Sequence, residues 1–140
     1  MDFTIPKEIN QEKERFKEFL DRQVKPNLPE WYRDGAVPSS FHLTMGQGGW
    51  YGFKLTNGRI EKQPGLRSAI LGEEIAALSP GVAVAVLAQS ELGLTGLWLY
   101  ASDALTRKYA EPALNGRTLI CLGNTETGAG SDSANISMTA

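Results

Sequence analysis

A loop rich in glycines and hydroxyls, close to the C-terminal end of this sequence, is its part best suited to chemistry. Residues 123–132 read Gly-Asn-Thr-Glu-Thr-Gly-Ala-Gly-Ser-Asp, and they follow the apolar run 119–122. Glycines let a ligand approach the main chain without a Cβ in the way, and successive backbone N–H groups in such a loop can bind an anion. The loop is therefore predicted to bind a cofactor or another anionic ligand.

The spacing of these residues excludes the common phosphate-binding and nucleophile motifs. A P-loop needs a lysine after its last glycine, and this chain has Ser131 and Asp132 there. The dinucleotide fingerprint and the nucleophile elbow each need a glycine at position 133, which is a serine. His42 is the only histidine, so the sequence offers little for a histidine-based nucleophile or a metal site. We therefore assign no catalytic residue and no metal ligand.

The loop resembles the hallmark segment of the acyl-CoA dehydrogenase family. That segment reads roughly small, apolar, Thr or Ser, Glu, two variable residues, small, Gly, Ser or Thr, Asp. The departure is Asn124, where the family usually has an aliphatic residue, while Thr127 stands where proline is common but not required. Weaker matches, such as residues 71–76, and the order of the predicted elements extend the resemblance over nearly the whole chain.

The resemblance implies that the loop binds FAD. It implies cofactor contacts from Leu122, Asn124, Thr125, Gly130 and Ser131. Thr125 would offer its hydroxyl and backbone N–H to the pyrimidine edge of the flavin, and Gly130 would permit close approach. Ser131 would bond the cofactor pyrophosphate or the pantetheine arm of the substrate. From the residues alone, the alternative is an ordinary glycine-rich connection with no ligand.

Helices must position this loop, because the upstream sequence is helical in pattern. Apolar positions recur at three, four and seven residue steps, and prolines and serines mark helix starts. The predicted helices are residues 6–25, 39–47, 64–78, 82–100 and 103–115, with a turn-rich connector at 29–38 and a turn at Asn57-Gly58. Strands are predicted at 119–122 and 134–139. The predicted fold is an all-α helical bundle, similar to the N-terminal domain of acyl-CoA dehydrogenases, with a short C-terminal β segment.

The helix at 82–100 carries one formal charge, Glu91, in nineteen residues. Its length approaches that of a membrane span, but its glycines and polar residues and the lack of flanking basic clusters favour a helix buried on every side. By the resemblance, the acyl chain lies near this helix. We expect substrate contacts from Ala83 and Leu87 here, with Val84 and Ala88 nearby, and from Ser131 in the loop.

The composition argues against some kinds of partner and against a disulfide-bonded protein. A net charge of −2 without a basic stripe argues against a nucleic-acid partner, and the single cysteine, Cys121, leaves no disulfide framework. The N-terminus lacks a signal-peptide pattern, so we expect a cytoplasmic protein that does not enter a membrane.

The resemblance also implies a domain organisation and a function for the chain, and one alternative function stays open. Residues 1–117 would form the helical N-terminal domain, and residues 118–140 the start of a β-domain carrying the flavin loop. The chain would be the N-terminal portion of a FAD-dependent dehydrogenase that introduces an α,β double bond into an acyl-CoA. Its base would lie in a C-terminal part that this sequence lacks. Its partners would be the acyl-CoA and the remainder of the enzyme or a second subunit, in a homo- or hetero-oligomer. The alternative is a non-catalytic helical module or pseudoenzyme subunit that pairs with another polypeptide.

Overall fold

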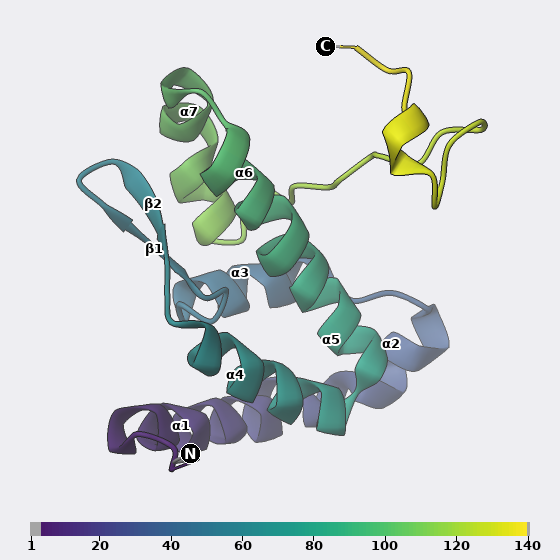
Figure 1. Cartoon of the computed structure of the whole chain (residues 1–140). Helices are drawn as coiled ribbons and strands as arrows, with labels where there is room; N and C mark the ends of the chain where they lie inside the picture. Colours follow the sequence, from purple (N-terminus) through teal and green to yellow (C-terminus); the bar gives the residue numbers. More distant parts are fainter. Residues whose placement is uncertain (1–3, 140) are drawn as a thin grey trace.

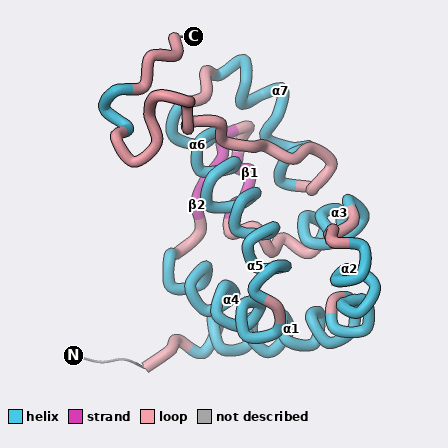
Figure 2. Tube along the Cα trace, turned by 90° about the vertical axis from the view of Figure 1, so that its right-hand side faces the viewer, coloured by secondary structure: helices cyan, strands magenta, loops and turns pink. Residues whose placement is uncertain are grey.

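The computed structural model describes residues 4–139, most of which are helical, and this confirms the predicted helical fold. The helices enclose an apolar core, and a small hairpin lies against one end of them (Figures 1 and 2). The α-helices are α1 (Lys7–Gln23), α2 (Leu28–Asp34), α3 (Ser39–Gln47), α4 (Gly65–Leu78), α5 (Pro80–Leu87), α6 (Thr95–Tyr100) and α7 (Asp103–Leu114). Single 3₁₀ turns occur at η1 (Lys25–Asn27) and η3 (Ser133–Asn135), and a π-helical segment, η2 (Ala88–Leu94), joins α5 to α6.

Helix α1 packs along α4 through its predicted apolar face (Figure 1). Phe16, Leu20 and Val24 recur every four residues, which places them on one side of the helix, and all three are buried. An ion pair also joins the two helices, with 2.6 Å between Arg67 Nη2 and Glu12 Oε1. The apolar stripe and this pair fix α1 against α4.

The connector predicted at residues 29–38 contains a helix, α2, and that prediction was wrong. Pro29 lies in the first turn of α2, where a proline needs no hydrogen-bonded N–H and its fixed φ suits the helix. Gly35 ends the helix with a φ of 64°, and Trp31 packs against Phe41 of α3 with 5.1 Å between the ring centroids. The prolines that suggested a turn therefore also allow a short helix to begin.

Residues 80–100 form one helical rod with a π-helical middle, seen as the long diagonal of Figure 1. Ser79 caps it, accepting a hydrogen bond from the Val82 N–H. One side of the rod lies in the core, but Val84 is 66% exposed and Tyr100 85% exposed, so the expectation of burial on every side was wrong. By length and composition this rod is the one helix among the described residues that could cross a membrane, and 39% of its most apolar window is buried.

A two-stranded antiparallel hairpin, β1 (Phe53–Thr56) and β2 (Arg59–Lys62), was not predicted. The turn that joins its strands was predicted, since Asn57 and Gly58 have φ angles of 52° and 77°, the left-handed pair that a tight hairpin requires. Trp98 of α6 meets Phe53 edge-on, with 6.1 Å between ring centroids. The hairpin thus packs on the end of the rod.

Residues 119–139 form no strand, so the predicted C-terminal β segment was wrong. A strand needs a neighbour for its backbone N–H and C=O groups, and no other strand lies beside residues 119–122 or 134–139 in the described chain. Leu119 and Leu122 are more than half exposed. This segment extends away from the helices, as the yellow-green trace in Figure 1 shows.

Candidate functional site

The glycine loop is closed on itself by Glu126. One oxygen of its carboxylate accepts hydrogen bonds from the backbone N–H and the hydroxyl of Ser137, at 3.0 and 2.8 Å, and the other accepts from the Met138 N–H at 2.7 Å. The backbone groups of Glu126 and Ala129 also bond to one another. These hydrogen bonds favour the charged carboxylate and lower the pKa of Glu126. Glu126 therefore holds the shape of the loop and is a weak base.

Thr125 and Ser131 keep their donors free. Both are exposed, and neither forms a hydrogen bond, through side chain or backbone, with any residue between 4 and 139. Gly130 lies in open space, since a Cβ added there would meet only Thr125 Cγ2 at 4.0 Å. Two hydroxyls and their amides are thus available to a ligand. Uncharged donors of this kind suit the polar edge of a flavin and the oxygens of a pyrophosphate, so the donor set fits FAD.

The other predicted cofactor contacts also lie on the surface. Leu122 is 57% exposed, and Asn124 is exposed beside Thr125. The loop brings the five predicted residues into one short stretch of chain. It does not bury any of them, so a bound cofactor would need a second surface to enclose it.

The predicted substrate contacts on the rod fall on different sides of it. Ala83 is 3% exposed and belongs to the core, whereas Leu87 is 37% exposed. Val84 and Ala88, four residues apart, face solvent. In this structure a ligand lying on the solvent side of the rod would meet Val84 and Ala88, and Ala83 would be hidden from it.

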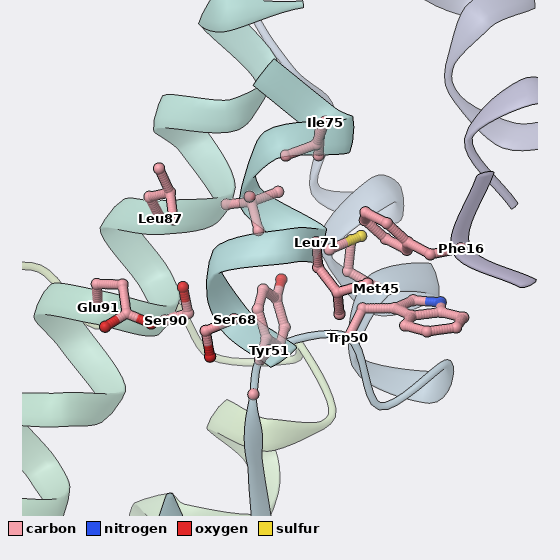
Figure 3. A pocket seen from close by; sticks show the side chains of 13 residues that line it. Phe16, Met45, Trp50, Tyr51, Ser68, Leu71, Ile75, Leu87, Ser90 and Glu91 are labelled. Carbon is pink, nitrogen blue, oxygen red and sulfur yellow. The ribbon is translucent and has the colours of Figure 1, made fainter. Parts of the chain in front are cut away.

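The interior of the helical body offers no room for such a ligand at the place where the rod meets α1, α3 and α4. A cavity of about 20 Å³ lies there, with aromatic and aliphatic side chains at one end (Figure 3). Ser68, Ser90 and Glu91 line the other end, and the buried hydroxyl of Ser68 forms no hydrogen bond within the described chain. Such a volume holds about one water molecule, so this cavity cannot take an acyl chain.

Glu91 is paired. The Lys62 ammonium donates to Glu91 Oε2 at 2.7 Å, which links β2 to the π-helical segment η2. Glu91 also borders the small cavity, so it is both a carboxylate with a partner and a polar group at that cavity.

Comparison with known proteins identifies the family. Residues 6–117 match the sequence model for the acyl-CoA dehydrogenase N-terminal domain. The chain belongs to the acyl-CoA dehydrogenase family. It is 30% identical over 145 residues to a glutaryl-CoA dehydrogenase of Desulfococcus multivorans, covering all of this chain and 37% of that protein. It is 26% identical over 125 residues to a 3-(aryl)acrylate reductase of Clostridium sporogenes, covering 89% of this chain and 33% of that protein.

Solved structures of family members share this fold. A probable acyl-CoA dehydrogenase from Mycobacterium abscessus superposes with a TM-score of 0.82 and 31% identity, over 94% of this chain and 35% of that one. A glutaryl-CoA dehydrogenase from Mycobacterium smegmatis, solved in complex with FADH2, gives a TM-score of 0.84 at 21% identity over 94% of this chain and 34% of that one. The acyl-CoA dehydrogenase domain described here therefore spans about a third of the length of its relatives.

Proposed function

We propose that this chain is the N-terminal portion of a FAD-dependent, cytoplasmic acyl-CoA dehydrogenase that introduces an α,β double bond into an acyl-CoA thioester. The observation that carries the proposal is the pair of free donors, Thr125 and Ser131, in a family-type loop beyond the helical domain. When bound, FAD would accept the hydride in this oxidation. Thr125 would hold the polar edge of the flavin ring, and Ser131 the pyrophosphate or the substrate's pantetheine arm.

The apolar solvent side of the rod would bind the acyl chain through Val84 and Ala88. Glu126 would not remove the substrate proton, because its hydrogen bonds to Ser137 and Met138 lower its pKa and hold it away from that task. The base would come from the part of the enzyme that follows, or from a second subunit. On its own, the 140-residue chain should not turn over substrate.

The test is flavin binding by the protein that contains this chain, either as a longer polypeptide or with its second subunit. The purified complex should show flavin absorbance and should reduce a dye in the presence of acyl-CoA. Thr125→Ala should weaken FAD binding by about three- to tenfold, the loss expected from one hydrogen bond. Thr127→Ala, in the same loop but outside the expected contacts, should leave binding unchanged. Colourless and inactive material in both formats would contradict the proposal.

A second function is favoured by the exposed apolar side chains of the rod, among them Val84, Leu92 and Tyr100. These would also suit a non-catalytic module that pairs with another polypeptide. A stoichiometric complex that contains no flavin would support this alternative.

A further inference from the structure

A single buried side chain, Gln89 of η2, holds the segment that leads into the glycine loop. Its amide nitrogen donates to the carbonyls of Ala113 and Thr118, at 3.1 and 3.0 Å, and its amide oxygen accepts from the Ile120 N–H at 2.8 Å. Gln89 is 2% exposed. It therefore spans the turn after α7, bonding the end of that helix and the extended chain beyond it.

Two of these backbone groups have no other partner in residues 4–139. The Ala113 carbonyl also accepts from the Gly116 N–H, but the Thr118 carbonyl and the Ile120 N–H bond to Gln89 alone. A buried or half-buried backbone group without a partner is costly. Gln89 is therefore the sole partner of these two groups among the described residues, while the Thr118 N–H donates to the Pro112 carbonyl at 3.1 Å.

Gly93 brings the segment close to the rod by a separate means. A Cβ at Gly93 would lie 2.5 Å from the Ile120 carbonyl oxygen and 2.9 Å from Ile120 Cβ. Any larger residue would push the chain outward at Ile120. Gln89 holds the segment by hydrogen bonds, and the missing side chain at Gly93 lets the segment lie close to the rod. Both residues belong to the π-helical turn of the rod.

Ile120 is also where the chain leaves the helical body. It packs against the core, whereas residues 121–125 are exposed. Thr125 follows only five residues later, so a displacement at Ile120 would move the free donors of the loop.

The geometry points to Gln89 as a positioning residue for the cofactor loop, with Gly93 as its steric counterpart. Gln89 touches neither flavin nor substrate, and it acts by fixing Thr118 and Ile120 against η2. The assignment rests on the proposed flavin role of the loop.

The anchoring can be measured without a cofactor, by amide hydrogen exchange at Ile120 and by a spin label on Cys121. Cys121 is the only cysteine and is exposed. Gln89→Met keeps the length of the side chain and removes all three hydrogen bonds. It should speed Ile120 exchange by about tenfold and give a more mobile label. Ser90→Ala, the adjacent and equally buried position, should change neither. Unchanged exchange in a folded Gln89→Met variant would overturn the inference.

Gly93→Ala tests the same displacement while leaving every hydrogen-bonding group in place. It should also mobilise the Cys121 label, whereas Gly96→Ala, where a Cβ meets nothing within 4 Å, should not. If Gly93→Ala leaves the label unchanged, Ile120 is not held against the rod as described.

A second experiment measures FAD binding by the flavin-containing protein. Gln89→Met and Gly93→Ala should each weaken FAD binding by about tenfold while far-UV circular dichroism stays unchanged. Wild-type protein without flavin would overturn the proposed function, even if the label shows the segment anchored. Wild-type protein that binds flavin, with variants that bind it as tightly, would overturn the positioning role alone.

Discussion

His42 is buried beside Tyr51, and its environment favours the neutral imidazole. Its Nδ1 lies 2.8 Å from the Tyr51 hydroxyl, which also donates to the His42 carbonyl at 3.2 Å. Burial lowers the pKa of His42 below its usual value and raises that of Tyr51. The only histidine of the chain is thus part of the core between α3 and the residues that follow it.

This burial makes stability depend on pH. As pH falls below about 6.5, the unfolded chain takes up a proton that the folded chain binds only at lower pH, so the free energy of unfolding should fall. Urea unfolding at pH 7.5 and 5.5 checks this. His42→Phe should flatten the slope over that range. Glu126, whose pKa is lowered from 4.5, should contribute only in more acidic solution. Equal slopes for both proteins would contradict the assignment.

The Glu12–Arg67 pair joins α1 to α4 with little exposure to water. The exposed fraction of the Arg67 side chain is 6%, and that of Glu12 is 21%. Glu12→Gln should lower the free energy of unfolding by about 2 to 3 kcal/mol, because the guanidinium stays buried and loses its charged partner. The hydrogen bond from Arg67 to the Gly49 carbonyl limits the loss.

Glu14→Gln is the matched control for this prediction, since Glu14 pairs with Lys17 on the exposed side of α1. Its effect should stay within about 0.5 kcal/mol. Chemical denaturation of both variants gives the comparison, and equal losses would mean that the Glu12–Arg67 pair contributes no more than a surface contact.

The close contact between α3 and the end of α7 requires a glycine at position 116. Gly116 stops α7 with a φ of 70°, and a Cβ there would lie 1.8 Å from the His42 carbonyl oxygen. Gly35 ends α2 with a similar φ of 64° but has nothing within 4 Å of an added Cβ. Substitutions at the two glycines therefore distinguish two effects: backbone strain, which both positions would suffer, and steric overlap, which only Gly116 would suffer.

Gly35→Ala should cost about 1 kcal/mol, the penalty of a left-handed backbone alone. Gly116→Ala should cost about 3 kcal/mol or more, because α3 must also move away from the turn. Thermal unfolding of the two variants measures the difference. A Gly116 variant no less stable than the Gly35 variant would show that α3 and α7 are not in contact there.

Local signals predicted these elements well where a cap or an apolar stripe was present. The helix at residues 39–47 has the predicted bounds, and Ser79 and Ser102 cap α5 and α7 as their positions suggest. Leu66 and Leu105 are about half exposed although both are apolar, because each lies in the first turn of a helix, beyond the edge of the core. The strands were missed because each has only four residues, and β2 has a single apolar residue, Ile60, to mark it.

The resemblance indicates Thr125, Gly130 and Ser131 because the residues that carry it are continuous in the sequence, and their contacts with a cofactor stay a prediction. Gln89 carries no such signal, since its partners lie 24 to 31 residues away. Which side of the rod is exposed depends on long-range packing, and for that reason Ala83 and Val84 could not be told apart.

For the whole molecule, the rod leaves apolar side chains uncovered. They are Val84, Leu87, Leu92, Trp98, Leu99 and Tyr100, each at least 37% exposed. Exposed apolar patches of this kind mark surfaces that another polypeptide or a ligand covers. In a chain about a third as long as its relatives, this surface should make the isolated domain associate with itself.

Sedimentation of the 140-residue chain at increasing concentration should show that association, and Leu92→Lys together with Leu99→Lys should reduce it. Leu105→Lys, which changes an equally exposed leucine on α7, should have little effect. A wild-type chain that remains monomeric at high concentration would show that the rod surface does not drive self-association.

The wide turn at residues 88–94 holds about one residue more than ordinary helical winding needs for the same rotation. Deleting one residue there would return the segment to ordinary winding and leave the later side chains of the rod facing nearly the same way. A deletion in α5, which is ordinary α-helix, would instead rotate each later side chain by about 100° around the axis. Trp98 would then leave Phe53, and the hairpin would lose its support. The rod should therefore tolerate a change of length at residues 88–94 better than one in α5.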